Sequence, residues 1–294
     1  MKILITGASG FLGSKIMACL PDAEFISLGR RPSDSIIADI PTGIPTLPKT
    51  DLVIHAAGKA HVIPKTRSES DEFFRVNLEG TNKLLTALSE SGSLPGTFVF
   101  ISTVAVYGLE TGSSIGEDVP LKGTTPYALS KIRAEESVLS WGKRYGVGVV
   151  ILRLPLIVGK GAPGNLGAMV KHIRRGTYFR IGNGSARRSM VLATDLGRLI
   201  PLLAGRTGIY NLTDRIHPSI AEIDTRIAAD LNKKVRVMPE GAAKLLARVG
   251  DLIPGSPFNT YRLKKLQDSL TFSDERAVSE LGWTPNAVLS GQIT

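Results

Sequence analysis

Tyr127 and Lys131 are the two side chains of this sequence best suited to move a proton together. They lie four residues apart in a segment of helical pattern after Pro126, so both fall on one face of the predicted helix. A phenol has a pKa of about 10, and a neighbouring ammonium group favours the phenolate and lowers that value. The spacing therefore predicts a proton donor for a carbonyl, with Tyr127 and Lys131 as catalytic residues.

The same spacing occurs again at Tyr261 and Lys265, so spacing alone does not identify the catalytic pair. Only the first pair lies between two apolar, strand-like segments. It also follows a strand that ends in a candidate hydroxyl group, at Ser102 or Thr103. We therefore expect chemistry at the first pair and none at the second. For Thr103 the alternative is a strand-end hydroxyl that only satisfies the backbone.

A glycine-rich turn near the start of the chain has the residues that bind a diphosphate. The sequence TGASGFLG at 6–13 follows an apolar strand pattern and opens a helical one. Its three glycines permit a tight turn, a close approach of backbone to phosphate, and contact between helix and strand. The positive end of the helix then attracts the phosphates. The turn predicts dinucleotide binding by Gly7, Ser9, Gly10, Phe11, Leu12 and Gly13.

Two arginines stand where the choice between NAD and NADP is usually made. An NAD site offers an acidic residue about 20 residues after the glycine turn, to bind the ribose 2′-hydroxyl. This sequence has Arg30 and Arg31 there, with no carboxylate beside them. Because guanidinium groups pair with a 2′-phosphate, NADP is the predicted cofactor and NAD the alternative. Exposed loop charges are the other interpretation of the arginines. Asp39, followed by Ile40, either binds the adenine amino group or forms a turn.

The elements that must position these residues alternate between strand and helix. Short apolar runs rich in β-branched residues predict strands, and longer runs with helical spacing predict helices. Strands that are almost wholly apolar are typical of a parallel sheet covered on both faces, which predicts an α/β, doubly wound Rossmann fold. The predicted strands are 2–6, 24–28, 52–55, 97–102, 147–152 and 208–212, and the predicted helices are 11–20, 71–89 and 127–145.

A second, smaller unit is predicted where this alternation loosens, from residue 156 onward. We assign residues 1–158 to a dinucleotide-binding domain, with returning segments at about 189–226, and residues 159–188 and 227–294 to a substrate-binding cap. Residues 160–194 carry seven lysines and arginines and no acidic residue, within a chain of net charge +10. This segment should therefore meet an anion.

The composition excludes several classes of protein. Of the 294 residues 43% are hydrophobic, which supports a large buried core. The single cysteine, Cys19, cannot form an intramolecular disulfide, and with only four histidines the usual closed zinc sites are also excluded, so we expect no metal. Neither an export signal nor a membrane span is recognisable, so we expect a cytoplasmic protein.

Taken together, these motifs resemble the extended short-chain dehydrogenases/reductases, also called the NAD-dependent epimerase/dehydratase family. The resemblance covers nearly the whole chain, and within the family it points to UDP-sugar 4-epimerases and UDP-4-keto-6-deoxy-N-acetylhexosamine 4-reductases. Besides the glycine turn it rests on VIHAA at 53–57, VNLEGT at 76–81, FISTVAVYG at 100–108, PYALSK at 126–131, LR at 152–153, YNL at 210–212 and LGWTP at 281–285.

The resemblance implies roles for individual residues. Thr103 would hydrogen-bond the reacting oxygen, and Tyr127 would protonate or deprotonate it. Lys131 would bind the nicotinamide ribose and lower the pKa of Tyr127. Asn165 would contact the nucleotide diphosphate and Arg188 its pyrophosphate, with a solvated surface charge as the alternative for Arg188. The residues implied to line the cofactor cleft are Ala56, Ala57, Asn77 and Leu154.

The residues after Thr103 narrow the reaction. Dehydratases of this family carry an acid and a base there, whereas this chain has Val104 and Ala105, which argues against dehydration. The reductive epimerases use a Cys and a His near the same place, but Cys19 lies in the first predicted helix, far from it. Two reactions at C4 of a nucleotide sugar remain. They are reduction of a 4-keto sugar by hydride from NAD(P)H, and epimerisation through a transient 4-keto sugar.

Reduction is the preferred interpretation, because one hydride and one proton suffice and because the arginines after the second strand favour NADP. The implied substrate is a UDP-4-keto-6-deoxy-N-acetylhexosamine of polysaccharide biosynthesis. A non-enzymatic dinucleotide sensor or nucleic-acid-binding protein is a further alternative, which the presence of Tyr127 and Lys131 disfavours. We therefore expect a nucleotide-sugar partner and no nucleic acid. The family often dimerises through two helices of each subunit, and 71–89 and 127–145 are the candidates for a homodimer.

Overall fold

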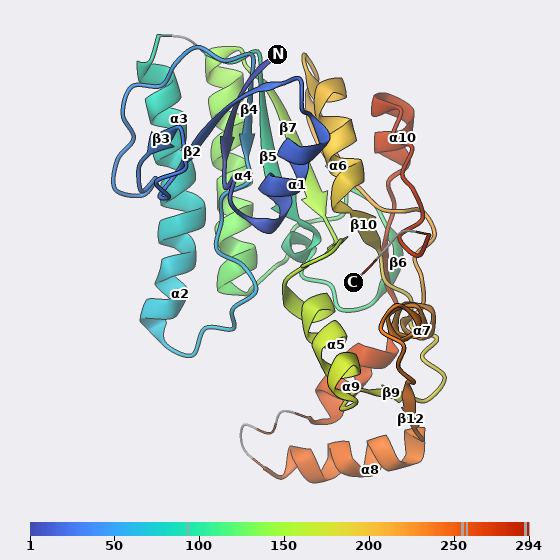
Figure 1. The fold of residues 1–294 in the computed structure, drawn as a ribbon. Helices are drawn as coiled ribbons and strands as arrows, with labels where there is room; N and C mark the ends of the chain where they lie inside the picture. Colours follow the sequence, from blue (N-terminus) through green and yellow to red (C-terminus); the bar gives the residue numbers. More distant parts are fainter. Residues whose placement is uncertain (93, 254–255, 257, 291–292, 294) are drawn as a thin grey trace.

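A parallel sheet of seven strands forms the centre of the molecule (Figure 1). The structure is a computed structural model and describes residues 1–92, 94–253, 256, 258–290 and 293. The order of the strands is β11-β7-β5-β4-β1-β2-β3, so the direction of winding reverses between β1 and β4, where open α/β sheets bind ligands. The predicted doubly wound fold is confirmed. The strands are β1 (Lys2–Thr6), β2 (Glu24–Gly29), β3 (Ile36–Ile37), β4 (Leu52–His55), β5 (Thr97–Thr103), β7 (Gly148–Leu154) and β11 (Gly208–Asn211).

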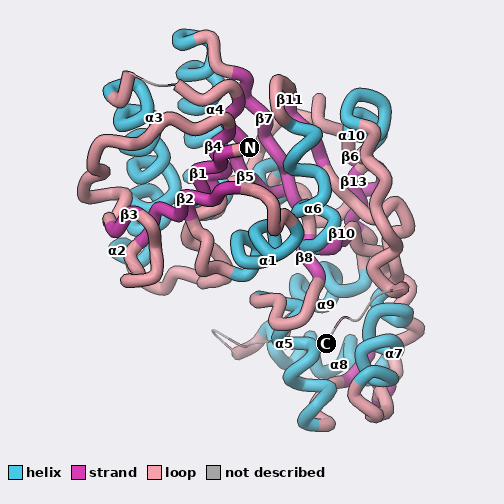
Figure 2. Tube along the Cα trace, turned by 45° about the horizontal axis from the view of Figure 1, so that its top comes forward, coloured by secondary structure: helices cyan, strands magenta, loops and turns pink. Residues whose placement is uncertain are grey.

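Helices cover both faces of this sheet. On one face, α1 (Phe11–Cys19) and α6 (Ala193–Leu199) pack side by side, as Figure 2 shows. On the other face lie α3 (Gly80–Glu90) and α4 (Pro126–Tyr145). The helix predicted at 71–89 begins earlier, as α2 (Arg67–Phe74), and reaches α3 through a π turn at Arg75–Glu79. Such turns occur often at functional sites.

The start of α4 is fixed by its own sequence. The Thr125 side chain accepts a hydrogen bond of 3.2 Å from the backbone N–H of Ala128, and Pro126 occupies the first turn, where its missing N–H costs nothing. Gly146 ends the helix in the left-handed conformation, at φ 68°. These signals place Tyr127 and Lys131 in the first two turns of α4, beside β5.

The remaining elements lie outside the seven-stranded sheet, and several of them form the cap around a separate apolar cluster that includes Ile173, Ile223 and Ile227. Three short parallel pairs, β10-β8, β12-β9 and β13-β6, connect segments distant in sequence. The strands are β6 (Gly112–Ile115), β8 (Leu156–Val158), β9 (Phe179–Ile181), β10 (Met190–Leu192), β12 (Arg236–Met238) and β13 (Leu270–Phe272). The helices are α5 (Gly164–Arg175), α7 (Ile220–Asp230), α8 (Glu240–Asp251), α9 (Thr260–Gln267) and α10 (Glu275–Leu281), with 3₁₀ turns at Val104–Tyr107 and Ile200–Leu203.

The segment that follows β13 packs on the main sheet rather than in the cap. Ala277, Leu281 and Trp283 are buried in the apolar cluster that α1 and α6 form with the sheet. The indole N–H of Trp283 donates to the carbonyl of Thr213 over 3.0 Å. The range 227–294 assigned to the cap from the sequence therefore contains a segment that belongs, by its packing, to the dinucleotide-binding domain.

Trp283 provides a test of this packing. We expect Trp283→Ala to lower the free energy of unfolding by about 3–5 kcal/mol, because the substitution leaves a large cavity and an unpaired carbonyl. Urea denaturation followed by circular dichroism measures the change. Leu202→Ala is the control, since Leu202 is 54% exposed and its truncation should cost less than about 0.5 kcal/mol. Equal losses in the two variants would refute this account of the tail.

Candidate functional site

The turn between β1 and α1 forms the floor of a cleft. Gly7 has φ 73°, and a Cβ atom there would lie 2.7 Å from the backbone nitrogen of Ala57. A Cβ atom on Gly13 would collide with the carbonyl oxygen of Gly7. No other residue type fits at these two positions, so the close approach of strand and helix depends on glycine.

The N-terminus of α1 opens into this cleft. Its N-cap residue is Gly10, which has no side chain to accept a hydrogen bond, and the first turn contains no acidic residue. The first backbone N–H groups of the helix, which have no partner within the helix, therefore remain available to an anion. The geometry of the turn is compatible with a bound diphosphate, and diphosphate binding by these residues stays a prediction.

One half of the cleft, about 480 Å³, extends from the glycine turn along the ends of β2 and β4. It contains eight of the predicted cofactor residues: Gly7, Ser9, Gly10, Arg30, Asp39, Ile40, Ala56 and Ala57. Arg31 does not line it. The turn after β2 directs this side chain into solvent, while the Arg31 backbone N–H donates to the Asp34 carboxylate over 2.8 Å.

The same turn corrects a second expectation. The sequence indicated that no carboxylate accompanies the two arginines, but Asp34 folds back against Gly29, at the end of β2. Its backbone N–H donates to the carbonyl of Arg31 over 2.9 Å, which closes the turn. A carboxylate therefore does accompany the two arginines, held against the end of β2 by local hydrogen bonds.

A third arginine, which the sequence analysis did not identify, completes this end of the cleft. Arg75, on the π turn, lies 3.9 Å from the Asp39 carboxylate, and Arg30 lies at the same distance from it. Asp39 therefore holds two guanidinium groups at the cleft wall. Helical periodicity did not point to Arg75, because a π turn shifts the side chains out of the regular phase.

The other half of the cleft, about 350 Å³, contains the predicted chemistry. Gly7, Gly10 and Ala56 line both halves, so the two halves form one continuous groove. Besides these three shared residues, the structure brings the three catalytic candidates together here with four further predicted cofactor residues. This half is lined by Thr103, Tyr127 and Lys131, and by Phe11, Leu12, Gly13 and Leu154.

Tyr127 is held as a neutral phenol. Burial raises its pKa, and a side-chain hydrogen bond with Thr103 partly opposes that shift. The ring packs against Phe73, with 6.0 Å between the ring centroids. Thr103 also accepts a hydrogen bond of 3.2 Å from the backbone N–H of Ala105, so its hydroxyl serves the backbone as well.

The expectation that Lys131 lowers the pKa of Tyr127 does not hold in this structure. The Lys131 ammonium group donates to the carbonyl of Ile101 over 2.8 Å and lies 4.5 Å from the centroid of the Phe100 ring. Burial lowers the pKa of Lys131 to about 8, against the opposing effect of the Glu135 carboxylate. Because the ammonium is directed to a strand carbonyl, burial and Thr103, rather than Lys131, determine the pKa of Tyr127 in this structure.

Behind the cleft lies a buried ion pair that the sequence analysis missed. Glu135 and Arg153 are 2% and 4% exposed, and their side chains meet at 2.8 Å. Ser102 donates to the same carboxylate. Glu135 comes one helical turn after Lys131, and this spacing was the available signal. The pair connects α4 with β5 and β7 directly beneath the catalytic candidates.

Asn77 is buried beside the cleft and does not line it. Its side-chain oxygen accepts from the backbone N–H of Lys59 over 2.7 Å, and its amide donates to the Lys59 carbonyl and to Ser130. These contacts use both ends of the amide. Asn77 therefore positions the 58–59 segment, which itself lines both halves of the cleft.

Of the three predicted substrate residues, Thr103 lines the cleft, whereas Asn165 and Arg188 line neither half of it. Asn165 is exposed in the first turn of α5. The Arg188 guanidinium donates to the carbonyls of Arg187 and Lys265 over 2.9 and 2.8 Å. Burial lowers the pKa of Arg188, and Asp268 opposes that shift. In this structure Arg188 therefore ties the segment before β10 to α9.

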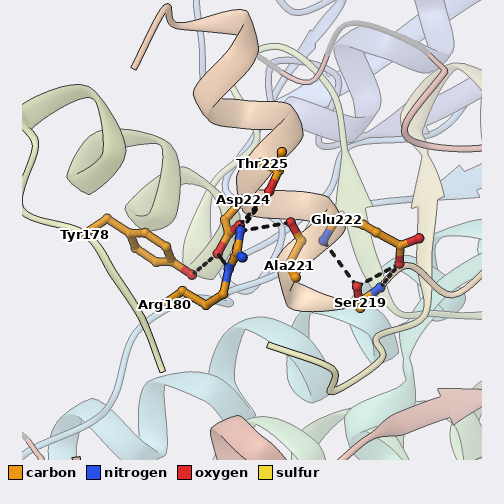
Figure 3. A network of polar contacts seen from close by, with 7 residues as sticks. All are labelled: Tyr178, Arg180, Ser219, Ala221, Glu222, Asp224 and Thr225. Carbon is orange, nitrogen blue, oxygen red and sulfur yellow. Dashed lines mark hydrogen bonds and ion pairs between the residues drawn. The ribbon is translucent and has the colours of Figure 1, made fainter. Parts of the chain in front are cut away.

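A separate cap pocket of about 240 Å³ contains Tyr178 and Phe179. Figure 3 shows Tyr178 and Arg180 pointing toward Asp224 on α7; the Tyr178 hydroxyl donates to that carboxylate over 3.1 Å, and the Arg180 guanidinium forms an ion pair with it. The absence of acidic residues from 160–194 therefore does not leave Arg180 unpaired, because α7 supplies the acid. The anion that Arg180 meets is thus a carboxylate of this chain, and contact of the rest of the segment with an external anion stays a prediction.

The start of α7 explains why Asp224 lies at this position. The Ser219 hydroxyl accepts from the backbone N–H of Glu222 over 3.2 Å, and the Glu222 carboxylate accepts from the backbone N–H of Ser219 over 2.7 Å (Figure 3). This capping box fixes the first turn of the helix. Asp224 then lies in the next turn, fully buried against the cap strand β9.

Tyr261, Lys265 and His55 do not line the half of the cleft that contains Tyr127. Tyr261 and Lys265 both contact Glu110 at the surface, so the second pair joins α9 to the loop after Gly108. His55 is buried between the hydroxyls of Thr6 and Thr81, and burial lowers its pKa to about 3. Among the described residues no group of His, Cys, Asp and Glu side chains is arranged to hold a metal ion.

The chain is similar in sequence and fold to proteins that are already characterised. Residues 3–212 match the model of the family described as "NAD dependent epimerase/dehydratase family". A UDP-glucose 4-epimerase of Azospirillum brasilense is 26% identical over 97% of this chain and 87% of its own length. A GDP-6-deoxy-D-mannose reductase of Pseudomonas aeruginosa is 35% identical over 52% of this chain and 51% of its own length. The solved structure of RMD from Pseudomonas aeruginosa complexed with NADPH has the same fold, with TM-score 0.73, 24% identity and coverage of 98% and 96%.

The buried ammonium of Lys131 predicts an unusual stability profile. We expect Lys131→Met to raise the free energy of unfolding at pH 7 by about 1–3 kcal/mol, because folding removes a charged group from water. The folded pKa of about 8 lies below the unfolded value of 10.5, so the unfolded state binds more protons between them. The free energy of unfolding of the wild type therefore rises as the pH rises from about 8 to 10.5. The difference in this free energy between Lys131→Met and the wild type should become smaller over the same pH range.

Urea denaturation at pH 7 and at pH 10 measures this change. Lys83→Met is the control, since Lys83 is exposed on α3 and its replacement should show no such narrowing. A Lys131→Met variant that is less stable than the wild type at pH 7 would contradict the prediction.

Proposed function

The chain belongs to the NAD-dependent epimerase/dehydratase family, and we propose that it reduces a nucleotide-linked 4-keto sugar at C4 with NADPH. It is an enzyme of this family and uses NAD(P). The specific substrate that we propose is a UDP-4-keto-6-deoxy-N-acetylhexosamine. Epimerisation of a UDP-sugar at C4 is the second candidate.

The observation that carries this proposal is the neutral Tyr127 beside Thr103, at the end of β5. When bound, the nicotinamide supplies a hydride to the carbonyl carbon. Tyr127 then gives its proton to the carbonyl oxygen, and the Thr103 hydroxyl holds that oxygen in place. A phenol whose pKa is raised keeps its proton throughout the neutral pH range, as a proton donor requires. Val104 and Ala105 offer no acid or base for dehydration.

Two arrangements at the far end of the cleft support NADPH. Arg30 and Arg75 both reach the wall where the adenosine ribose of a dinucleotide on the glycine turn would lie. Their guanidinium groups suit a 2′-phosphate, which carries more negative charge than a hydroxyl. The Asp34 carboxylate is already occupied by the backbone N–H of Arg31, so it offers a ribose hydroxyl less than a free acid would.

The epimerase candidate is supported by the 26% identity with a UDP-glucose 4-epimerase across most of both chains. The same three side chains could remove and return a proton at O4. Net cofactor oxidation distinguishes the two reactions, because epimerisation returns the hydride to the sugar. Absorbance at the reduced-nicotinamide band, recorded with a UDP-4-keto-6-deoxy-N-acetylhexosamine, should fall in proportion to substrate consumed. Interconversion of UDP-sugars without net oxidation would favour the epimerase.

Replacement of Tyr127 by Phe tests the proton donor. We expect Tyr127→Phe to reduce kcat by at least about a hundredfold, because general acid catalysis contributes typically that much or more. NADPH binding, followed by fluorescence titration, should remain close to that of the wild type. Tyr261→Phe is a matched control, because it removes the phenol hydroxyl of the second Tyr-Lys pair. Full activity in Tyr127→Phe would disprove the mechanism.

Replacement of Arg30 and Arg75 tests the cofactor preference. We expect Arg30→Ala and Arg75→Ala each to weaken NADPH binding about ten- to hundredfold, and NADH binding by less than about threefold, since only NADPH presents the phosphate. Arg206→Ala, at an exposed position near the opposite end of the sheet, is the control. Equal losses for both dinucleotides would show that these arginines do not read the 2′-phosphate.

A further inference from the structure

Helix α8 packs with its small residues inward and its large apolar residues outward. Ala243, Ala247 and Gly250 are buried, and the two alanines pack with Leu263 of α9. The outer side carries Leu245 and Leu246, which are 65% and 51% exposed. The other exposed apolar residues are Val249 at 49%, Leu252 at 82% and Ile253 at 56%. A surface helix of a soluble protein normally has the reverse arrangement.

The exposed residues form one continuous stripe, which we call the α8 face: Leu245, Leu246, Val249, Leu252 and Ile253. At about 100° per residue, Leu245, Leu246 and Val249 fall within a sector of about 100° on α8. Leu252 and Ile253 follow in the turn after Asp251, where the helix ends. Of the eighteen large hydrophobic side chains exposed in the described part of the chain, eight lie within 237–266. Single exposed apolar residues need no explanation, but a gathered patch marks an interaction site.

The position of α8 suits contact with a flat surface. Figure 1 shows α8 along the outer edge of the cap, at the far end of the molecule from the sheet. With 12 residues the helix is about 18 Å long, so its apolar stripe covers a few hundred Å² at most. A stable protein dimer buries about 800 Å² on each partner. The stripe is therefore too small to hold a second copy of the chain by itself.

The charges around the α8 face indicate what it contacts. Lys244 and Arg248 lie along one flank of the stripe, and both are exposed. Residues 233–268 contain eight lysines and arginines against three acidic residues. Two of those acids are engaged, since Glu240 pairs with Lys244 at 3.7 Å and Asp251 accepts from the backbone N–H of Thr260 at 3.0 Å. An aliphatic stripe without aromatic residues, flanked by cations, is unlike the core of a protein interface.

We propose that the α8 face rests on an anionic lipid membrane, with its aliphatic side chains among the acyl chains and its cations at the headgroups. None of the helices in the described residues is long and apolar enough to cross a membrane, so the contact is interfacial. The contact does not depend on which sugar the enzyme reduces. It holds the cap, and the pocket that contains Tyr178 and Phe179, close to the membrane plane.

Flotation with lipid vesicles tests this proposal. The full chain is mixed with vesicles of phosphatidylcholine and phosphatidylglycerol in equal parts, or of phosphatidylcholine alone, and centrifuged through a sucrose gradient. We expect wild-type protein to float with the anionic vesicles at least about tenfold more than with the neutral ones, and less as salt is added. Leu245→Ser/Leu252→Ser should reduce the bound fraction about tenfold, and Lys244→Gln/Arg248→Gln should abolish the preference for anionic lipid.

Leu139→Ser/Leu202→Ser is the matched control, because it removes two exposed leucines, on α4 and in the 3₁₀ turn 200–203, and should float like the wild type. Failure of the wild type to float with anionic vesicles, or equal flotation of Leu245→Ser/Leu252→Ser, overturns the proposal. So does a wild-type dimer, seen by light scattering, that this variant converts to a monomer without any vesicle binding. Turnover of soluble substrate, measured without vesicles, reports separately on the proposed reaction.

Discussion

The close approach of three backbone segments at Gly7 is the constraint on which the site depends. β1 meets the end of β4 at Ala57, and α1 meets β1 at Gly13, both at distances that a Cβ atom would not permit. This contact sets the direction of α1, and therefore the direction in which its free N–H groups point. It also places Phe11 where its ring packs with both the sheet cluster and the cap cluster. This one turn thus shapes the cofactor groove and positions Phe11, which packs against the cap.

A second layer of organisation comes from buried charge. Lys131 and Glu135 lie one turn apart on α4, and Arg153 lies on the neighbouring strand β7. All three are buried, so two cations and one carboxylate lie together beneath the cleft. The Lys131 ammonium also helps to keep His55 neutral, since both burial and that ammonium lower the histidine pKa. The surplus positive charge lies behind the half of the cleft that Tyr127 lines, where the proposed reduction would develop negative charge on the carbonyl oxygen. In a low-dielectric interior, such fixed charge stabilises a developing oxyanion more than water would.

The elements that depend on neighbouring residues in the sequence were predictable from the sequence. The strands, the helix starting near Tyr127 and the glycine turn follow from periodicity and capping residues within short windows. What failed depended on chain reversals and on tertiary partners. One turn directs Arg31 into solvent and brings Asp34 against Gly29. Arg180 pairs with an acid on α7, more than forty residues away in sequence. The inverted packing of α8 was equally hidden, because Ala and Gly on one side become the buried side only when α9 is in place.

The return of the chain to the sheet affects how the protein is made. During synthesis the glycine turn, β1, β4 and α1 emerge first, but Ala277, Leu281 and Trp283 of the same apolar cluster emerge only after the whole cap. Until then the nascent domain exposes part of its core to water, where other chains can contact it. A cofactor bound early at the glycine turn would shorten this vulnerable interval by favouring the folded state.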